Sequence, residues 1–299
     1  MRSTQKVSSL PESGLEYFIV TPAGDDVSVE QFSIESVDPR FRIVVEKEAL
    51  KQKHPAQEIV YALDPDLPVF IVKGTNMFDL SEPAVREHAE LFGDRLYKIE
   101  DAEQKRSYVL RYAACHQQFA MIKDWQLSYK HLPFGALEIA DAYRYEQSGE
   151  SMPCFRTRRL NMPDCHLFCK DLPEAQVWLK RLHDRIYDEV RQVGRDYELL
   201  VNVSSPQAYQ ENKALFLDLM RSVSKPALIH VYPPGKNYYW TVNIEYLLID
   251  VMDRPQEIAT VQIDVGNAKR FGIQFVDRDG DARYPVILHT AIDRWSFTS

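Results

Sequence analysis

Asp164 and His166 stand two residues apart in the segment MPDCHLFCKD, while Cys115 and His289 lie far from them in the sequence. One cysteine and two histidines suit zinc, and three protein ligands leave the fourth position of a tetrahedral ion open for a substrate. Histidines among apolar neighbours are also common in protein cores. Local sequence therefore leaves open a metal site, an anion site, a piece of core, or part of a larger site.

A second group of chemically capable residues lies in RYEQSGESMPCFRTRR, which contains Arg144, Arg156 and Arg158. Each guanidinium presents paired donors that match the oxygens of a phosphate. The same residues also suit a solvated surface, which is the simpler interpretation. Either role requires other elements to hold these side chains in place.

Helices are predicted where apolar residues recur at helical spacing. SEPAVREHAELF opens with Ser81 as a candidate N-cap, and CHQQFAMIKDWQLSY predicts a second helix that reaches beyond Trp125. The clearest helix covers residues 171–194, with Val177 among its apolar positions. This third helix is predicted to be scaffold.

The last third of the chain is predicted to form strands: KPALIHVYP, YYWTVNIEYLLIDV, QEIATVQIDVG, RFGIQFV and ARYPVILHT. Short polar turns join several of them, which is typical of antiparallel hairpins. We expect the α+β class, with an antiparallel β-sheet flanked by helices. Residues 1–73 are predicted to be a small N-terminal segment and residues 74–299 the main core. No Gly-rich nucleotide fingerprint opens a helix, so neither a Rossmann site nor a P-loop is expected.

Composition limits the class of protein. The net charge of -8 and the sequence pI near 5.6 argue against binding nucleic acid through bulk electrostatics, so any RNA contact must be local. The polar start MRSTQKVSSLPESG has no apolar signal region and no stretch is long enough to span a membrane, so we expect a cytoplasmic protein. The four cysteines form no CxxC pair and are expected to be free thiols.

The ordered series of motifs resembles the catalytic core of class II aminoacyl-tRNA synthetases, and specifically the archaeal type of threonyl-tRNA synthetase. The resemblance rests on GTNMFDLSEPAVREHAELFGDRLY, RYAACHQQFAMIKDWQLSYKHLPFGALEIADAYRYEQSGE, MPDCHLFCKD and TVQIDVGNAKRFG followed by YPVILHTAI, and covers residues 74 to about 290. It implies a fold with an antiparallel sheet, the substrates threonine, ATP and tRNA(Thr), and the cofactors Zn²⁺ and, with ATP, Mg²⁺.

Roles follow from the resemblance position by position. It assigns Cys115, His166 and His289 to zinc, Arg144 to the α-phosphate as the catalytic electrophile, Glu146 to adenine, Arg156 to a second phosphate contact, Gln262 to the ATP and adenylate site, and Asp164 to the threonine ammonium. Leu160 stands where the family has an aromatic residue that stacks on adenine, so only a hydrophobic contact is expected there.

The implied chemistry is attack of the threonine carboxylate on the α-phosphorus of ATP, which needs positioning and charge neutralisation rather than a protein nucleophile. Valine has the shape of threonine, and an apolar pocket separates the two by only about a hundredfold. A metal that ligates both the amino group and the hydroxyl of threonine would exclude valine. Serine would still be accepted, and no segment long enough for an editing domain is evident.

Two segments depart from the family pattern. EKEALKQKHPAQEIVYALDPDLPVF is short for the motif 1 dimer interface, so a homodimer is possible without being indicated. After HTAI the family continues into motif 3 and an anticodon-binding domain, whereas this chain reads DRWSFTS, so we expect both to be missing. Arg294 is either a candidate substitute for the motif 3 arginine or a surface residue. Two functions therefore stay open: threonine activation and threonyl-tRNA synthesis, or an impaired paralogue or truncated product that acts as a threonine- and zinc-binding or regulatory module.

Overall fold

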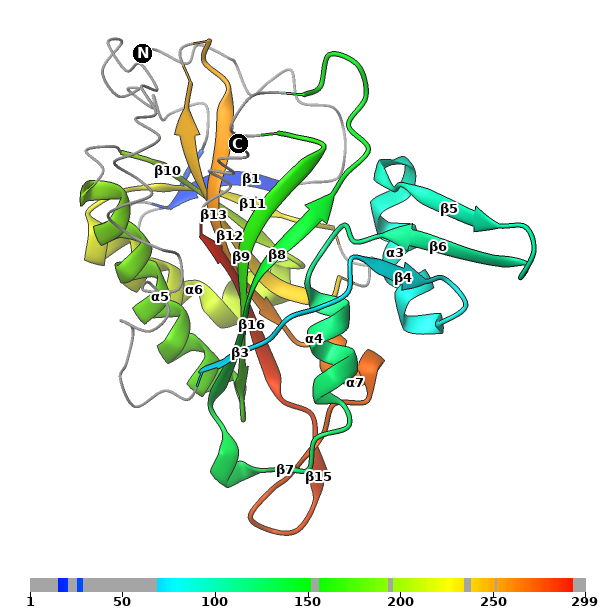
Figure 1. The fold of residues 1–299 in the computed structure, drawn as a ribbon. Coiled ribbons are helices and arrows are strands. Elements are labelled where there is room, and N and C mark those ends of the chain that lie inside the picture. Colours follow the sequence, from blue (N-terminus) through cyan, green and yellow to red (C-terminus); the bar gives the residue numbers. More distant parts are fainter. Residues whose placement is uncertain are drawn as a thin grey trace. The chain divides into compact units, whose positions relative to one another are not determined.

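The computed structural model describes residues 16–20, 26–28, 69–151, 156–192, 196–233, 238–250 and 252–292 (Figure 1). The chain divides into two compact units, one formed by residues 1–53 and 172–266 and the other by residues 54–171 and 267–299. Each unit contains β-strands and helices. The α+β class, with largely antiparallel strands and flanking helices, is confirmed.

The first unit is built on strands that run β2-β1-β11-β10-β12-β13 in spatial order. Their bounds are β1 (Glu16–Val20), β2 (Asp26–Ser28), β10 (Glu198–Val203), β11 (Ala227–Val231), β12 (Trp240–Ile249) and β13 (Pro255–Asp264). All neighbours are antiparallel except β10 and β11. Because β1 pairs with β11, part of the predicted N-terminal segment joins this sheet; the boundary at residue 73 itself stays a prediction.

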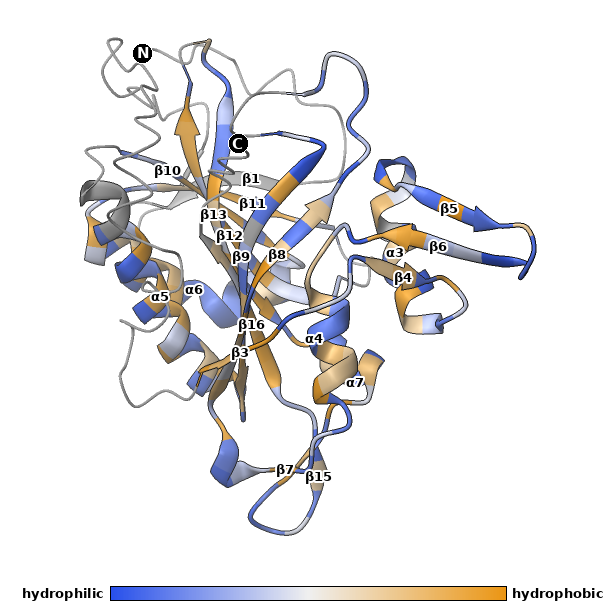
Figure 2. Cartoon of the chain, in the orientation of Figure 1, coloured by the Kyte–Doolittle hydropathy of each residue, from blue (hydrophilic) through white to orange (hydrophobic). Residues whose placement is uncertain are grey.

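Two helices, α5 (Leu172–Gln192) and α6 (Pro206–Val223), accompany these strands. Along α5, hydrophobic and hydrophilic residues alternate at helical spacing, as Figure 2 shows. Leu179, Leu182 and Ile186 are fully buried, whereas Val177 is 55% exposed, so its placement on the apolar face was wrong. Helix α6 begins after Ser205, whose side chain accepts a hydrogen bond from the Ala208 amide and caps the helix.

The second unit is built on a sheet in the order β16-β9-β8-β3. Its strands are β3 (Val69–Ile71), β8 (Phe134–Tyr143), β9 (Arg159–Cys169) and β16 (Val286–Ile292). Strands β8, β9 and β16 are antiparallel neighbours, and β3 runs parallel to β8. The long antiparallel strands place residues from opposite ends of the sequence in adjacent rows.

Smaller elements complete the second unit. The strands are β4 (Met77–Asp79), β5 (Lys98–Asp101), β6 (Arg106–Leu110), β7 (Leu127–Ser128), β14 (Phe275–Val276) and β15 (Ala282–Arg283), and the helices are α3 (Pro83–Phe92), η2 (Gly93–Arg95), α4 (Cys115–Ile122), η3 (Tyr129–His131) and α7 (Asn267–Phe271). None of the helices that the structure describes has the length and apolar character needed to cross a membrane.

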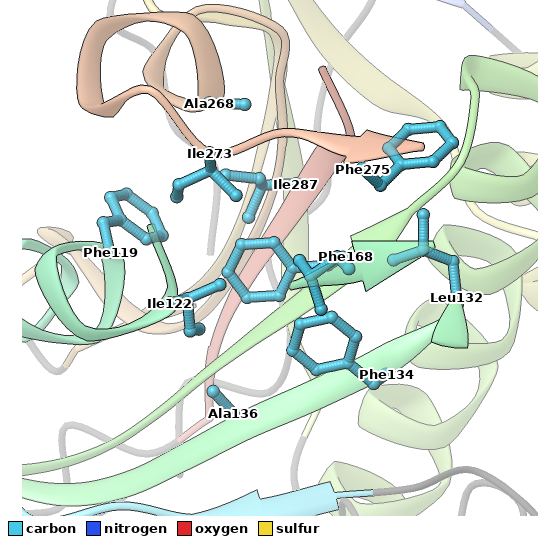
Figure 3. Close-up of a cluster of buried hydrophobic side chains, with 11 residues drawn as sticks. Phe119, Ile122, Leu132, Phe134, Ala136, Phe168, Ala268, Ile273, Phe275 and Ile287 are labelled. Atoms are coloured by element: carbon cyan, nitrogen blue, oxygen red, sulfur yellow. The ribbon is translucent and has the colours of Figure 1, made fainter. Parts of the chain in front are cut away.

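A buried apolar cluster holds α4 against the sheet of the second unit (Figure 3). Phe119 and Ile122 of α4 lie among side chains that include Phe134 of β8 and Phe168 of β9, and all four are at most 2% exposed. The rings of Phe134 and Phe168 stack with centroids 4.8 Å apart. This packing fixes α4, and with it Cys115, relative to β8 and β9.

Some local predictions differ from the structure. The N-cap of α3 is Glu82 instead of Ser81, and α4 ends at Ile122, before Trp125. The strand predicted over RFGIQFV is wrong in its first half, because Phe271 ends the short helix α7. Gly272 follows with a φ of 74°, a conformation that glycine adopts without strain and that commonly terminates helices. Arg294 lies outside the described residues, and so does the segment that stands in place of motif 1, except for its last two residues, Val69 and Phe70, which belong to β3.

Candidate active site

Strand alternation selects the residues of the site. Successive side chains of β9 point to opposite faces of the sheet, so Asp164 and His166 share one face and Cys165 lies on the other. Strand β9 lies between β16 and β8 (Figure 1). On the shared face, His166 pairs with His289 of β16, and Asp164 pairs with Glu138 of β8. Residues separated by more than a hundred positions are thus brought side by side.

Cys115 reaches this face from the first turn of α4. Its Sγ lies 3.7 Å from Nδ1 of His289, and that nitrogen lies 3.1 Å from Nε2 of His166. The three atoms all lie within 4.8 Å of one another. In a tetrahedral zinc site, two nitrogen ligands are about 3.3 Å apart and a sulfur and a nitrogen about 3.6 Å apart. The donor set and its spacing therefore fit zinc.

The state of His166 also suits a metal ligand. Burial, followed by the neighbouring His289 and His116, holds the pKa of His166 well below its ordinary value of 6.5. Its Nδ1 lies 2.7 Å from Oε1 of Gln118, an acceptor. A neutral imidazole with its proton on Nδ1 fits this contact and leaves the lone pair of Nε2 on the side of His289.

Asp164 places a carboxylate beside the cluster. Its Oδ1 lies 3.7 Å from Nε2 of His166, and the residue is 6% exposed. Burial raises the pKa of this carboxyl to about 6, although His289 and Arg111 act in the opposite direction. A carboxylate in such an environment is stabilised by a bound cation such as an ammonium group.

Arg144 follows the end of β8 and is half-buried. Its Nε donates to the backbone oxygen of Tyr112 at 3.3 Å, and its guanidinium lies 5.7 Å from the centre of the Phe92 ring. The positive charge of Arg144 also lowers the pKa of Asp164, which places both groups in one electrostatic environment. Arg144 is thus oriented by its neighbours and lies near the carboxylate.

The structure brings two other predicted ligand residues into contact with each other. Nε of Arg156 donates to Oε2 of Glu146 at 2.7 Å, and Nη2 of Arg156 lies 3.3 Å from Oε2 of Glu150. Glu146 is only 2% exposed, and its backbone oxygen accepts a hydrogen bond from Nε of Arg158. The carboxylates of Glu146 and Glu150 hold the guanidinium of Arg156 in place.

Leu160 and Gln262 have different surroundings. Leu160 is buried with Ala142, and Ala291 packs against both, on the same face of β9 as Asp164. Gln262 belongs to the first unit, on β13, where its Oε1 accepts a hydrogen bond from the Tyr239 hydroxyl at 3.0 Å. The roles expected for these two residues at an adenylate site stay predictions.

Residue patterns did not identify three buried polar residues. The guanidinium of Arg111 pairs with the carboxylate of Glu138, which also accepts the Gly74 amide at 2.7 Å, and Gln118 contacts His166. A signal was present in each case: Arg111 and Glu138 are single charges within apolar runs, and Gln118 follows Cys115 by three residues, on the same side of the helix.

Comparisons with known proteins identify the family of the chain. Residues 97–295 match the family model described as tRNA synthetase class II core domain (G, H, P, S and T). The chain is 54% identical over 226 residues to a threonine–tRNA ligase of Thermofilum pendens, and the aligned region covers 76% of this chain and 36% of that protein. It is 43% identical over 327 residues to a threonine–tRNA ligase of Hyperthermus butylicus, and this aligned region covers 96% of this chain and 52% of that protein.

Among solved structures, the RNA binding domain of threonyl-tRNA synthetase from Cryptosporidium parvum Iowa II is similar, with a TM-score of 0.65 at 20% sequence identity, over 80% of this chain and 60% of that one. At this identity the likeness concerns the fold alone. The chain spans 36% of the Thermofilum protein and 52% of the Hyperthermus protein.

Proposed function

Because the chain belongs to the family of class II tRNA synthetase core domains, as its match over residues 97–295 shows, we propose that it activates threonine. The reaction joins threonine to ATP as threonyl-adenylate, and tRNA(Thr) then accepts the threonyl group. The names of the two archaeal relatives support threonine as the amino acid. Dimerisation stays a prediction.

The observation that carries this proposal is the convergence of Cys115, His166 and His289 beside Asp164. These three residues would hold Zn²⁺, which could take both the amino group and the hydroxyl of threonine as further ligands by expanding to five-coordination. Asp164 would take up the ammonium group of threonine as it enters the site. Once that group has released a proton to solvent, its nitrogen can ligate the metal while Asp164 accepts a hydrogen bond from a remaining N–H. Valine has no hydroxyl to offer, so the chain's own ligand arrangement distinguishes two amino acids of nearly equal shape.

The arginines serve the phosphate chemistry. Arg144 neutralises charge that develops on the α-phosphate, and its contacts with Tyr112 and Phe92 hold the guanidinium in one orientation before the reaction. Glu146 and Arg156 bind the adenine and a second phosphate oxygen, and their mutual ion pair keeps both side chains close to that site. Mg²⁺ accompanies ATP in this family.

The test uses the purified chain. We expect about one zinc per chain by elemental analysis, and threonine binding in calorimetry that disappears after chelation, with no binding of valine. Cys115→Ala should remove the metal and threonine binding. Cys165→Ala is the matched control, because this cysteine is the neighbour of His166 on the opposite face of β9.

Retention of zinc by the double variant His166→Ala, His289→Ala would refute the metal site. Threonine binding that survives both chelation and Cys115→Ala would refute selection through the metal. Valine binding as strong as that of threonine would refute threonine as the substrate.

A further inference from the structure

We propose that Gln118 is a positioning residue that fixes the ring of His166 so that Nε2 faces the metal. The proposal rests on the function proposed above. A glutamine can be buried in a helix without orienting a neighbouring histidine, so burial alone does not establish this role. The role is inferred from two contacts of the Gln118 amide group, one through its oxygen and one through its nitrogen.

The first contact sets the proton of His166. Oε1 of Gln118 lies 2.7 Å from Nδ1 of His166, and both side chains are fully buried. An amide oxygen can only accept, so Nδ1 must carry the proton of the neutral ring. The other nitrogen, Nε2, then presents its lone pair on the side of Nδ1 of His289, 3.1 Å away, within the cluster that also contains Cys115.

The second contact fixes the orientation of the amide. Nε2 of Gln118 lies 3.5 Å from the backbone oxygen of Asp164. If the amide were turned over, its oxygen would face that backbone oxygen and its NH₂ group would face Nδ1 of His166. Two acceptors would then oppose each other in a buried place, which is unfavourable. The geometry therefore selects the orientation in which Gln118 accepts from His166.

The same helical turn supplies a ligand and the residue that orients another ligand. Cys115 and Gln118 are three residues apart in α4, so they lie on one side of the helix. Phe119 adds a steric limit, because its ring lies edge-on to His166 with centroids 5.0 Å apart. Through Gln118, α4 also touches the backbone of Asp164, the residue proposed to hold the ammonium group.

Hydrogen bonds to the second nitrogen of a metal-binding histidine fix the tautomer and increase the basicity of the ligand, and their loss typically lowers metal affinity by 10–100-fold. A carboxylate at this position would serve equally well as an acceptor. A side chain of similar length without an acceptor would not. Substitutions that keep or remove the acceptor therefore distinguish a hydrogen-bonding role of Gln118 from a role in packing alone.

The experiment compares Gln118→Met, Gln118→Glu and Gln117→Met. Methionine keeps the length but removes the acceptor, glutamate keeps the acceptor, and Gln117→Met is the same substitution at the next position of α4. The zinc dissociation constant is measured by competition with a chromophoric chelator, and Co²⁺ substitution reports ligand geometry through its visible absorption. Thermal unfolding checks that each variant is folded.

We expect Gln118→Met to weaken zinc binding by about 10–100-fold and to alter the Co²⁺ spectrum. Gln117→Met should stay within about threefold of the original chain, a margin well below the loss expected for the acceptor. Gln118→Glu keeps the acceptor for His166 but loses the donor to the backbone oxygen of Asp164, so it should lose less zinc affinity than Gln118→Met. Excess zinc should restore threonine binding in Gln118→Met, since Cys115, His166 and His289 remain; a variant that had merely lost its structure would not recover.

Unchanged zinc affinity in Gln118→Met would overturn this inference and leave the proposed function standing. Equal losses in Gln118→Met and Gln118→Glu would overturn it as well. Absence of zinc from the unaltered chain would instead remove the proposed metal site, and the role of Gln118 with it. Should Gln118→Met not fold, ¹⁵N NMR of the zinc-loaded chain decides: a proton on Nδ1 of His166 supports the inference, and metal ligation through Nδ1 overturns it.

Discussion

Breaking the buried ion pair of Arg111 and Glu138 by removing one partner is expected to destabilise strongly the unit that holds the site. Arg111 is fully buried and Glu138 is 1% exposed, and Nη1 of Arg111 donates to Oε1 of Glu138 at 2.9 Å. The same carboxylate accepts the Gly74 amide. Arg111 lies four residues before Cys115, ahead of the start of α4, and Glu138 is the strand partner of Asp164, so the pair joins both parts of the proposed threonine pocket.

The size of the effect follows from which groups are left unpaired. Glu138→Leu leaves a buried guanidinium without its partner, which costs about 3–5 kcal/mol of unfolding free energy. Arg111→Met leaves a buried carboxylate and should cost about the same. The double variant removes both charges and leaves the Gly74 amide as the unsatisfied group, for about 1–3 kcal/mol. The coupling between the two residues should therefore amount to several kcal/mol.

Urea denaturation followed by circular dichroism measures these free energies. The matched control is Asp141→Leu on the same strand, because Asp141 pairs with Arg159 at the surface, where the arginine side chain is 62% exposed. This exposed pair should contribute less than about 1 kcal/mol. If the two single losses at Arg111 and Glu138 simply add in the double variant, the pair is not coupled and the explanation is wrong.

Two further outcomes are expected. Arg144→Ala should slow threonine-dependent pyrophosphate exchange by at least about two orders of magnitude, because a preorganised donor to the developing charge is lost, whereas Lys180→Ala at the surface should change little; equal behaviour of the two variants would refute the phosphate role. Burial lowers the pKa of His183 from 6.5 to about 4, so the unfolded chain takes up a proton first as pH falls, and unfolding free energy should decrease between pH 6.5 and 4 by about 3 kcal/mol from this residue. Denaturation of His183→Gln across that range should show a correspondingly smaller slope, and an unchanged slope would contradict the assignment.

Sequence by itself determined the local elements and the residues that could share a face. Helical spacing gave the long helix observed at Leu172–Gln192, and the order of motifs pointed to the family. Once residues 159–169 are known to form β9, alternation along the strand separates Asp164 and His166 from Cys165. The helix and the strand alternation depend on neighbours a few positions away, and such local periodicity is visible in a single sequence. The strand expected over RFGIQFV was wrong because Gly272 acts as a helix end there, and glycine fits both patterns.

Only the tertiary structure decided which candidates meet. Cys115 and His289 are 174 positions apart and His166 and His289 are 123 apart, and no local pattern encodes that distance. Their meeting depends on the register of β16 against β9, since a shift of one residue would turn His289 to the other face of the sheet. That register follows from the packing of whole strands and of α4, which involves many residues at once. The ion pair of Glu146 and Arg156, and the contact of Gln118 with His166, likewise required the folded chain.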